Sequence, residues 1–226
     1  MQSAASFEQN IHACTACPRL RKHCLEVART KRHAYENQEY WGRPVAPFGD
    51  PKASLLVVGL APGAHGANRT GRIFTGDRSG DWLYRALHRA GFANQPLSTS
   101  LTDGLALSRA RVTCVVKCAP PDNKPTTLEI NTCIHRFFDQ EITLHPEVRV
   151  YIALGRLAWD SIQKQFPGSR RVAFKHGAEQ TLPEGKIILA SYHPSQQNTF
   201  TGRLTEPMFD SVFARAGELL NLLKDV

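Results

Sequence analysis

The stretch "SLLVVGLAPGAHG" (residues 54–66) decides the fold class, because a run of apolar β-forming residues passes directly into a loop rich in glycine. A continuous apolar run of this length is typical of a strand that is buried on both faces of a parallel sheet. The pattern Gly-x-x-Pro-Gly at its end indicates a tight loop, in which backbone N–H groups can approach a ligand closely. We therefore expect a buried strand over residues 54–60 that ends at a binding loop.

Two common phosphate-binding motifs do not fit this loop, which continues as "GLAPGAHGANRTGRIFTGD" (residues 59–77). The lysine of a P-loop is missing, and the spacing of Gly59, Gly63 and Gly66 departs from the G-x-G-x-x-G dinucleotide fingerprint. The sequence therefore does not favour a nucleoside triphosphate or NAD as the ligand.

Three further apolar runs follow the first one, and amphipathic helical patterns separate all four. The runs cover residues 112–118, 148–154 and 186–191, and the helical patterns cover residues 80–92, 127–144, 156–166 and 206–223. Strands that alternate with helices predict a parallel sheet with helices on both faces. Ligands of such sheets bind beyond the carboxyl ends of the strands. We expect one crevice there, formed by the loops "GLAPGAHG", "KCAPPDNKP", "LGR" and "SYHPSQQN".

The length and composition favour one ordinary α/β domain with an N-terminal extension. The chain has 226 residues and a mass of 25.1 kDa, and its mean hydropathy is −0.32. A soluble protein is expected, because no apolar run reaches the roughly 20 residues that span a bilayer. The first residues, "MQSAASFEQNIHACTACPRL", do not resemble a signal peptide, so a cytoplasmic location is expected.

The charge balance favours a polyanionic partner. Lys and Arg number 28 against 20 Asp and Glu, which gives a net charge of +8 and a pI near 9.4. Such a surface attracts nucleic acids through steering and counterion release. A basic surface without any partner is the alternative.

The six cysteines are expected to be reduced in that compartment, where they favour metal binding or catalysis over disulfides. Cys14 and Cys17 form a C-x-x-C pair, and 14 residues separate Cys118 from Cys133. Together the two pairs could complete a four-thiolate site, which suits zinc and an iron–sulfur cluster equally. A pair of small buried side chains without a metal is the alternative for the C-x-x-C pair.

The other two cysteines, Cys24 and Cys114, are predicted to be small buried side chains. A metal on the two pairs would tie the N-terminal extension to the domain, because the pairs lie far apart in the sequence. Loss of the metal is then expected to loosen the fold before it affects any chemistry.

Three segments together resemble the uracil-DNA glycosylase superfamily, most closely its family 5, the iron–sulfur-containing type B enzymes of bacteria and archaea. They are "YWGRPVAPFGDPKASLLVVGLAPGAHGANRTGRIFTGDRSG", "KCAPPDNKPT" and "SYHPSQQNTFTGRLT", and the resemblance runs from Cys14 to the last helix. It implies a three-layer α/β/α sandwich with a central four-stranded parallel sheet. One domain over residues 1–226 is expected, with residues 1–50 as a helical extension. The resemblance also implies a [4Fe-4S] cluster on Cys14, Cys17, Cys118 and Cys133.

The implied activity is that of a monofunctional DNA repair glycosylase. Such an enzyme hydrolyses the N-glycosidic bond of uracil in DNA and leaves an abasic site. Because the bond is unreachable inside the stack, the base has to flip out of the duplex. The protein is expected to be a monomer that binds double-stranded DNA. No membrane partner is expected. The alternatives are a noncatalytic binder of damaged or uracil-containing DNA and, third, a metal-stabilised nucleotide hydrolase.

The resemblance also implies roles for individual residues. His193 is expected to donate a hydrogen bond to the uracil O2 as negative charge develops on the leaving base. Asp77 and Asn123 are expected to orient water or stabilise the sugar cation, although Asp77 could instead cap a helix and Asn123 could serve a turn. Phe74 is expected to stack on the base. The substrate-binding set is Gly59, Leu60, Ala61, Pro62, Gly63, His65, Phe74 and Ser195.

The chain departs from related families at Leu60 and Cys114. Many of those families carry an acidic or amide residue at the position of Leu60, and family 4 relatives often have asparagine at that of Cys114. Since a cysteine cannot supply the paired donor and acceptor of an amide, we expect looser base selection that extends to other deaminated or altered bases. Candidate phosphate contacts are Arg69, Arg72, Arg78 and Arg203. The candidates for a wedge into the duplex are Gln196, Gln197, Asn198 and Phe200.

Overall fold

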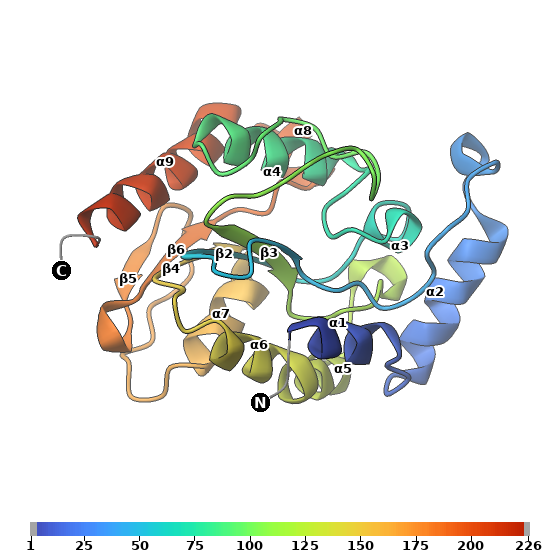
Figure 1. Cartoon of the computed structure of the whole chain (residues 1–226), viewed down its shortest axis with the longest axis horizontal. Helices are drawn as coiled ribbons and strands as arrows, with labels where there is room; N and C mark the ends of the chain where they lie inside the picture. The colour runs from blue at the N-terminus through green and yellow to red at the C-terminus, as the bar shows by residue number, and fades with distance from the viewer. Residues whose placement is uncertain (1–3, 224–226) are drawn as a thin grey trace.

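A computed structural model describes residues 4–223 and contains one mixed sheet between two layers of helices (Figure 1). The strand order is β1-β3-β2-β4-β6-β5. The four inner strands are parallel, which confirms the predicted four-stranded core of a three-layer α/β/α sandwich. They are β3 (Ala110–Cys114), β2 (Leu55–Gly59), β4 (Val150–Leu154) and β6 (Ile187–Ser191).

Two short antiparallel strands that the sequence did not predict extend the sheet at its edges. They are β1 (Phe48–Gly49) beside β3 and β5 (Glu179–Thr181) beside β6. Neither carries an apolar run, because β1 has two residues and β5 reads Glu-Gln-Thr. Their pairing protects the edges of the parallel core.

Figure 1 shows α4 and α9 above the sheet and α5, α6 and α7 below it. A π-helical segment, η3 (Ile134–Phe138), joins α5 to α6, so the helix predicted over residues 127–144 is continuous but locally widened. The helices are α1 (Ala4–His12), α2 (Pro18–Thr30), α3 (Ala67–Thr70), α4 (Arg78–Arg89), α5 (Thr127–Cys133), α6 (Asp139–Leu144), α7 (Arg156–Lys164), α8 (Gln196–Phe200) and α9 (Glu206–Leu222). Three short 3₁₀ turns are η1 (His33–Tyr35), η2 (Pro121–Asn123) and η4 (Pro183–Gly185).

Local sequence signals explain where the long helices start. The Thr205 hydroxyl accepts a hydrogen bond from the N–H of Met208 at the start of α9. At α5, Thr126 and Glu129 form a capping box, in which each side chain accepts from the backbone N–H of the other residue. These caps satisfy N–H groups that have no partner inside the helix.

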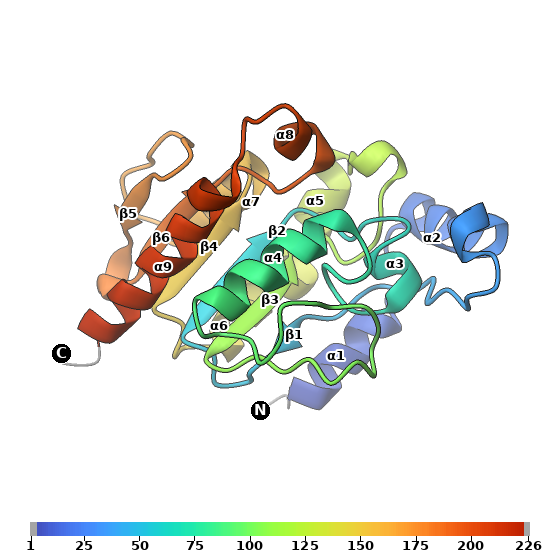
Figure 2. The ribbon, with the colours of Figure 1, turned by 90° about the horizontal axis from the view of Figure 1, so that it is seen from above.

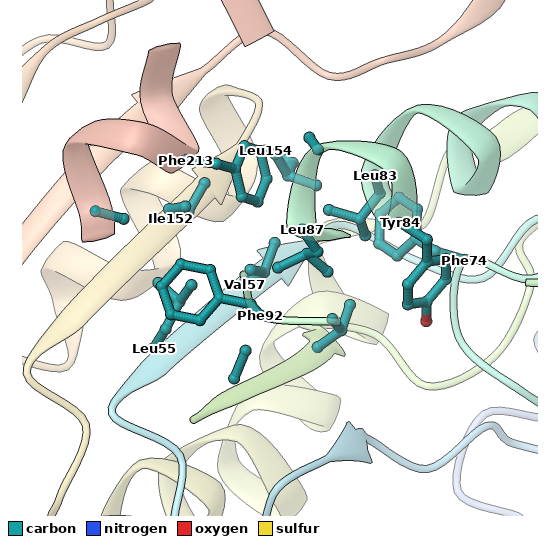
Figure 3. Packing of buried hydrophobic residues seen from close by; sticks show 14 of the residues in the cluster. Leu55, Val57, Phe74, Leu83, Tyr84, Leu87, Phe92, Ile152, Leu154 and Phe213 are labelled. Carbon is teal, nitrogen blue, oxygen red and sulfur yellow. The ribbon is translucent and has the colours of Figure 1, made fainter. Parts of the chain in front are cut away.

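The core under α4 and α9 is built from alternate residues of the strands (Figure 3). Leu55 and Val57 of β2 and Ile152 of β4 face Leu87 of α4 and Phe213 of α9, and all five side chains are fully buried. The intervening strand residues form a second core against α7. Burial on both faces explains the unbroken apolar runs in the sequence.

The carboxyl ends of the parallel strands lie at one edge, since Gly59 pairs with Cys114 and Leu154 with Ser191. The second strand was predicted over residues 112–118, and β3 ends four residues earlier. The chain beyond it stays buried, and the N–H of Val115 donates to the carbonyl of Gly59 (3.0 Å). The predicted site loops therefore meet at this edge.

The N-terminal helices α1 and α2 pack against the segment that follows β3. Phe7 and Ile11 of α1 and Leu20 of α2 join a third buried cluster with Val116 and Phe137. Figure 2 shows α1 and α2 at the end of the molecule away from β5 and α9. No helix within residues 4–223 is long and apolar enough to cross a membrane.

Candidate active site

A cleft of about 650 Å³ opens at the carboxyl edge of the parallel strands. Loops after β2, β3 and β6 line it together with the end of the N-terminal extension. The predicted site residues in its wall are Leu60, Ala61, Pro62, Gly63, His65, Phe74, Asp77, Asn123, His193 and Ser195. Three of the four loops that the sequence predicted therefore line one crevice, and the predicted loop "LGR" after β4 adds no residue to its wall.

The floor of the cleft depends on Gly59, which itself does not line the wall. A Cβ atom at Gly59 would lie 2.7 Å from the ring of Phe74 and 3.0 Å from the Cys114 sulfur. The absence of a side chain thus lets the tip of the Phe74 ring approach the end of β2 closely. Phe74 has a positive φ of 52°, and the Tyr84 hydroxyl donates to the carbonyl of its neighbour Ile73 (2.8 Å). A strained backbone held in this way is typical of a functional site.

His193 lies beside Phe74 in the wall of the cleft. The two ring centroids are 5.8 Å apart, with an angle of 33° between the ring planes. Burial lowers the pKa of His193 to about 4, so the imidazole is neutral at pH 7 and carries one N–H donor. Its ring nitrogens have no hydrogen-bond partner within residues 4–223, which argues against a histidine that merely bonds a core carbonyl. The donor is free for a ligand.

Asp77 acts as a helix cap and also reaches the cleft. Its Oδ1 atom accepts a hydrogen bond from the N–H of Gly80 (3.0 Å) at the start of α4. Its Oδ2 atom lies over the glycine-rich loop, since a Cβ at Gly63 would be 2.9 Å from it and one at Gly66 would overlap with it. Burial raises the pKa of the Asp77 carboxyl above its usual value.

Asn123 and Ser195 occupy two lips of the cleft. Asn123 is exposed and, like Asp122, has a left-handed backbone, with φ values of 55° and 53°. The turn role that the sequence left open is therefore compatible with a place in the wall. The Ser195 hydroxyl accepts from the N–H of Asn198 (3.4 Å) and caps α8.

The sequence missed two wall residues from the N-terminal extension, Arg32 and Tyr35. They lie near His65, whose Nδ1 atom is 3.1 Å from the Tyr40 hydroxyl. Burial and then the charge of Arg32 lower the pKa of His65. A run of basic residues over positions 19–32 is the one signal that could have indicated this part of the wall.

Two of the arginines expected to contact phosphate are instead structural. Arg69 donates to the carbonyls of His65 and Gly76 (both 2.7 Å), and Arg72 pairs with Asp103 (2.8 Å). Both guanidinium groups are buried. The sequence could not show this, because their acceptors come from loops that only folding brings together.

The other two arginines are exposed. The guanidinium carbon of Arg78 lies 4.5 Å from the ring centre of Phe200, and that of Arg203 lies 4.6 Å from the ring centre of Tyr192. Arg78 also lines the cleft. These two remain available to phosphates.

The four cysteines expected to hold a metal lie around one small cavity between α2, α5 and the segment after β3. Its wall contains Cys14, Cys17, Cys118 and Cys133. The backbone N–H of Lys117 donates to the sulfur of Cys133 (3.3 Å). Burial raises the pKa of the Cys133 thiol to about 11, so any metal has to displace a proton there.

The surroundings of this cavity suit a negatively charged group. Arg21 lines it, and its buried Nη1 atom has no partner among the described residues. An unpaired buried donor of this kind calls for a missing acceptor. No three His, Cys, Asp or Glu side chains within residues 4–223 are arranged to hold a single metal ion. Cys24 and Cys114 are buried, as predicted.

A family model described as the uracil DNA glycosylase superfamily matches residues 46–217. Among curated proteins, a "Type-5 uracil-DNA glycosylase" of Thermus thermophilus is 51% identical over 219 residues, which cover 96% of this chain and 98% of the relative. One of Mycobacterium leprae is 49% identical over 97% of both chains, and one of Pyrobaculum aerophilum is 44% identical over 93% and 90%. A "Type-4 uracil-DNA glycosylase" of the last organism is only 29% identical over 70% of this chain.

The family model covers most of the chain, and the similarity to the type-5 proteins extends over nearly its whole length. The fold and the expected resemblance agree with both comparisons. This chain belongs to the uracil DNA glycosylase superfamily and, within it, to the type-5 family.

Proposed function

We propose that this protein is a monofunctional glycosylase that hydrolyses the N-glycosidic bond of uracil in DNA and leaves an abasic site. The observation that carries the proposal is the pair of rings, Phe74 and His193, that lie beside each other in the wall of the cleft at the carboxyl edge of the sheet. The full-length similarity to proteins named uracil-DNA glycosylases supports it. The excess of positive charge supports a DNA substrate.

The cleft suits a base that has flipped out of double-stranded DNA. Its volume of about 650 Å³ lies within the usual range for small-molecule sites, which leaves room for a base and its sugar. The Phe74 ring offers an aromatic surface on which a base can stack. The absence of a side chain at Gly59 leaves the space that this ring occupies. Uracil opposite guanine is the favoured substrate, because a mismatched pair costs least to open.

His193 stabilises the leaving base in this proposal. Cleavage of the glycosidic bond leaves negative charge on the pyrimidine, and a preorganised N–H donor lowers the energy of that anion. A neutral imidazole donates one such hydrogen bond to the uracil O2 without first losing a proton. The low pKa of His193 and its free ring nitrogens support this role.

Asp77 and Asn123 handle the sugar side of the reaction. The transition state of glycoside cleavage resembles an oxocarbenium ion, which a nearby carboxylate stabilises and a positioned water attacks. Leu60 lines the cleft, but its apolar side chain can neither stabilise the sugar cation nor position a water molecule. The Asp77 carboxylate is the nearest alternative on the same loop, and its raised pKa suits a base. Asn123 approaches from the opposite lip and assists in orienting the water.

The cofactor in this proposal is a [4Fe-4S] cluster held by Cys14, Cys17, Cys118 and Cys133. The all-thiol cavity and the unpaired Nη1 atom of Arg21 support it. When bound, the cluster supplies cross-links and no base chemistry. It would tie residues 1–50 to the rest of a single domain over residues 1–226.

Looser base selection follows from Cys114 in the same proposal. This residue is buried with its sulfur close to Gly59, at the position where family 4 relatives often carry an asparagine. The thiol cannot reproduce that paired donor and acceptor. Hypoxanthine, xanthine, hydroxymethyluracil and ethenocytosine are therefore further candidate substrates, and a protein that releases uracil alone would contradict this part.

The experiment uses an end-labelled duplex with one uracil opposite guanine, incubated with the protein and then with or without alkali. We expect strand breakage only after alkali for the wild type, and a loss of breakage for His193→Ala. The matched control is His135→Ala, because His135 is 77% exposed and does not line the cleft. This control should retain the activity.

Three outcomes would contradict parts of the proposal. Breakage without alkali would show lyase activity. Saturable binding of the uracil duplex without release of any base would favour the noncatalytic binder. Equal activity of His193→Ala and His135→Ala would remove His193 from the mechanism.

A further inference from the structure

The N-terminal extension concentrates positive charge at one end of the molecule. Residues 18–35 contain six Lys and Arg side chains and one Glu, which accounts for five of the eight net positive charges of the chain. This segment forms α2, the following loop and η1. Figures 1 and 2 show α2 at the end of the molecule farthest from β5 and α9.

Half of these cations are exposed and unpaired. Lys22, Arg29 and Arg32 form no ion pair or hydrogen bond through their side chains with any described residue. In contrast, Arg19 is held by Glu129 (2.7 Å), and Arg21 donates to the carbonyl of Gly42 (3.1 Å).

The spacing places two of the free cations on one helix face. Lys22 and Arg29 are seven residues apart, which is two turns and about 10 Å along the axis of α2. The one acidic residue of the segment, Glu26, lies between them and leaves the face positive. A distance of about 10 Å corresponds to about three nucleotide steps along one DNA strand, at roughly 3.4 Å per step.

The same segment leads directly into the cleft. Arg32 and Tyr35 line the cleft wall near His65. The helix is also fixed to the body, because Leu20 and Cys24 are fully buried and the Asn68 amide of α3 donates to the carbonyl of Cys24 (3.3 Å). The helix therefore keeps a constant position beside α3, and Lys22 and Arg29 lie on its exposed face, opposite Leu20 and Cys24.

We propose that the exposed basic face of α2, together with Arg32, binds backbone phosphates of the DNA strand beside the flipped nucleotide. The inference rests on the proposed function for the identity of the polyanion. Free cations that continue into a cleft fit a phosphate backbone, which offers regularly spaced single negative charges. We call this face, defined by Lys22, Arg29 and Arg32, the α2 arm.

The test compares two triple variants that remove equal charge. Lys22→Ala/Arg29→Ala/Arg32→Ala removes the α2 arm. The control, Lys52→Ala/Lys164→Ala/Arg171→Ala, removes three exposed cations elsewhere. Lys52 precedes β2 and Lys164 ends α7, so both lie toward the opposite edge of the sheet.

Binding is measured by fluorescence anisotropy with a labelled duplex that carries one uracil opposite guanine, between 50 and 200 mM salt. Loss of the α2 arm should weaken binding about tenfold and lower the slope of log K against log salt by about two to three, since each phosphate contact contributes about 0.9. The control should keep a slope close to that of the wild type.

Equal salt slopes for the two triple variants would contradict the proposal that the α2 arm binds phosphates, because the net charge of the protein alone would then explain DNA binding. If the alanine variant has a lower melting temperature, the corresponding triple glutamine variant gives the same comparison with longer side chains. The proposed function is tested separately by uracil release from the wild type. A wild type that binds DNA through the α2 arm but releases no base would contradict the proposed glycosylase function. The proposed binding role of the α2 arm would still hold.

Discussion

At the scale of single residues, the contact between Gly66 and Asp77 links the glycine-rich loop to chemistry. A Cβ atom at position 66 would overlap with the Asp77 carboxylate, so we expect Gly66→Ala to displace this group. Overpacking of this kind costs about 1–3 kcal/mol of stability, and a displaced catalytic group costs about a hundredfold in rate. Thermal melting and single-turnover uracil release measure the two effects.

Gly217→Ala is the matched control for that substitution. Gly217 lies within α9, and a Cβ there would meet nothing within 4 Å. Alanine should stabilise the helix by about 0.5–1 kcal/mol and leave the rate unchanged. An equal rate for Gly66→Ala and the wild type would contradict the assigned position of Asp77.

Two substitutions separate the capping role of Asp77 from its catalytic role. Asparagine caps helices about as well as aspartate, so Asp77→Asn should melt near the wild type but lose about 10²–10⁴ in rate. Asp77→Ala should lose the cap as well, at a further cost of about 1 kcal/mol. The wild-type rate should fall as the pH drops through the raised pKa of Asp77, and the asparagine variant should lack this limb. An asparagine variant with full activity would leave Asp77 only as a cap.

His193 gives a prediction about protonation. Its pKa of about 4 in the folded protein lies below the usual value of 6.5, so the unfolded chain binds more protons between these limits. This residue should therefore make the folded state more stable as the pH rises from about 4 to 6.5. Carbon-13 NMR of the histidine rings, with His193→Ala for assignment, should show one ring that stays neutral until about pH 4. A ring that titrates near 6.5 would contradict the desolvation of His193.

Sequence reasoning found the residues that lie on strand-end loops and missed those that depend on distant contacts. Phe74 and His193 follow apolar runs, and the topology of a parallel sheet brings such positions together. Tyr35 reaches the cleft from a separate extension, and no periodicity predicts that contact. Arg72 looked like a surface cation because its partner Asp103 lies 31 residues away.

At the scale of elements, a buried ion pair joins β3 to α6. Lys117, just beyond β3, places its ammonium group 2.8 Å from Glu141 of α6, and their side chains are 2% and 0% exposed. Removal of one partner leaves a buried unpaired charge, so Glu141→Ala should destabilise the protein by about 3–5 kcal/mol. The double variant Lys117→Met/Glu141→Leu should recover most of this loss, and urea denaturation measures both.

The exposed pair between Arg215 and Glu179 is the control for this prediction. Glu179→Ala should change the denaturation midpoint far less than Glu141→Ala, because water screens the exposed pair. A Glu141→Ala variant as stable as the wild type would mean that the ammonium group of Lys117 finds another partner.

The helices and strands could be predicted where their burial requires a regular pattern of apolar residues in the sequence. The four parallel strands are buried on both faces and read as apolar runs. The edge strands β1 and β5 are too short and too exposed to produce a pattern. The end of β3 was misplaced because Val115 and Val116 after it are apolar and fully buried, although the chain there leaves the sheet toward the cysteine cavity.

At the scale of the whole molecule, the cysteine cavity connects parts of the chain that the sheet does not hold. Cys14 and Cys17 lie just before the start of α2, and Cys133 ends α5. The two main cores on the faces of the sheet contain none of the four cavity cysteines. Loss of a group bound there should therefore loosen the N-terminal helices and leave the sheet intact.

Cys17→Ser tests this separation through hydrogen exchange followed by mass spectrometry. Peptides from α1 and α2 should exchange markedly faster than in the wild type, while peptides from β2, β4 and β6 should stay protected, because local opening depends on local contacts. Thr15→Ala is the control, since this exposed residue lies between the cysteines and leaves all four in place. Faster exchange across the whole chain would show that the cavity supports the sheet as well. Unchanged exchange in α2 would show that the ion pair of Arg19 with Glu129 and the buried face of α2 hold the helix without any bound group.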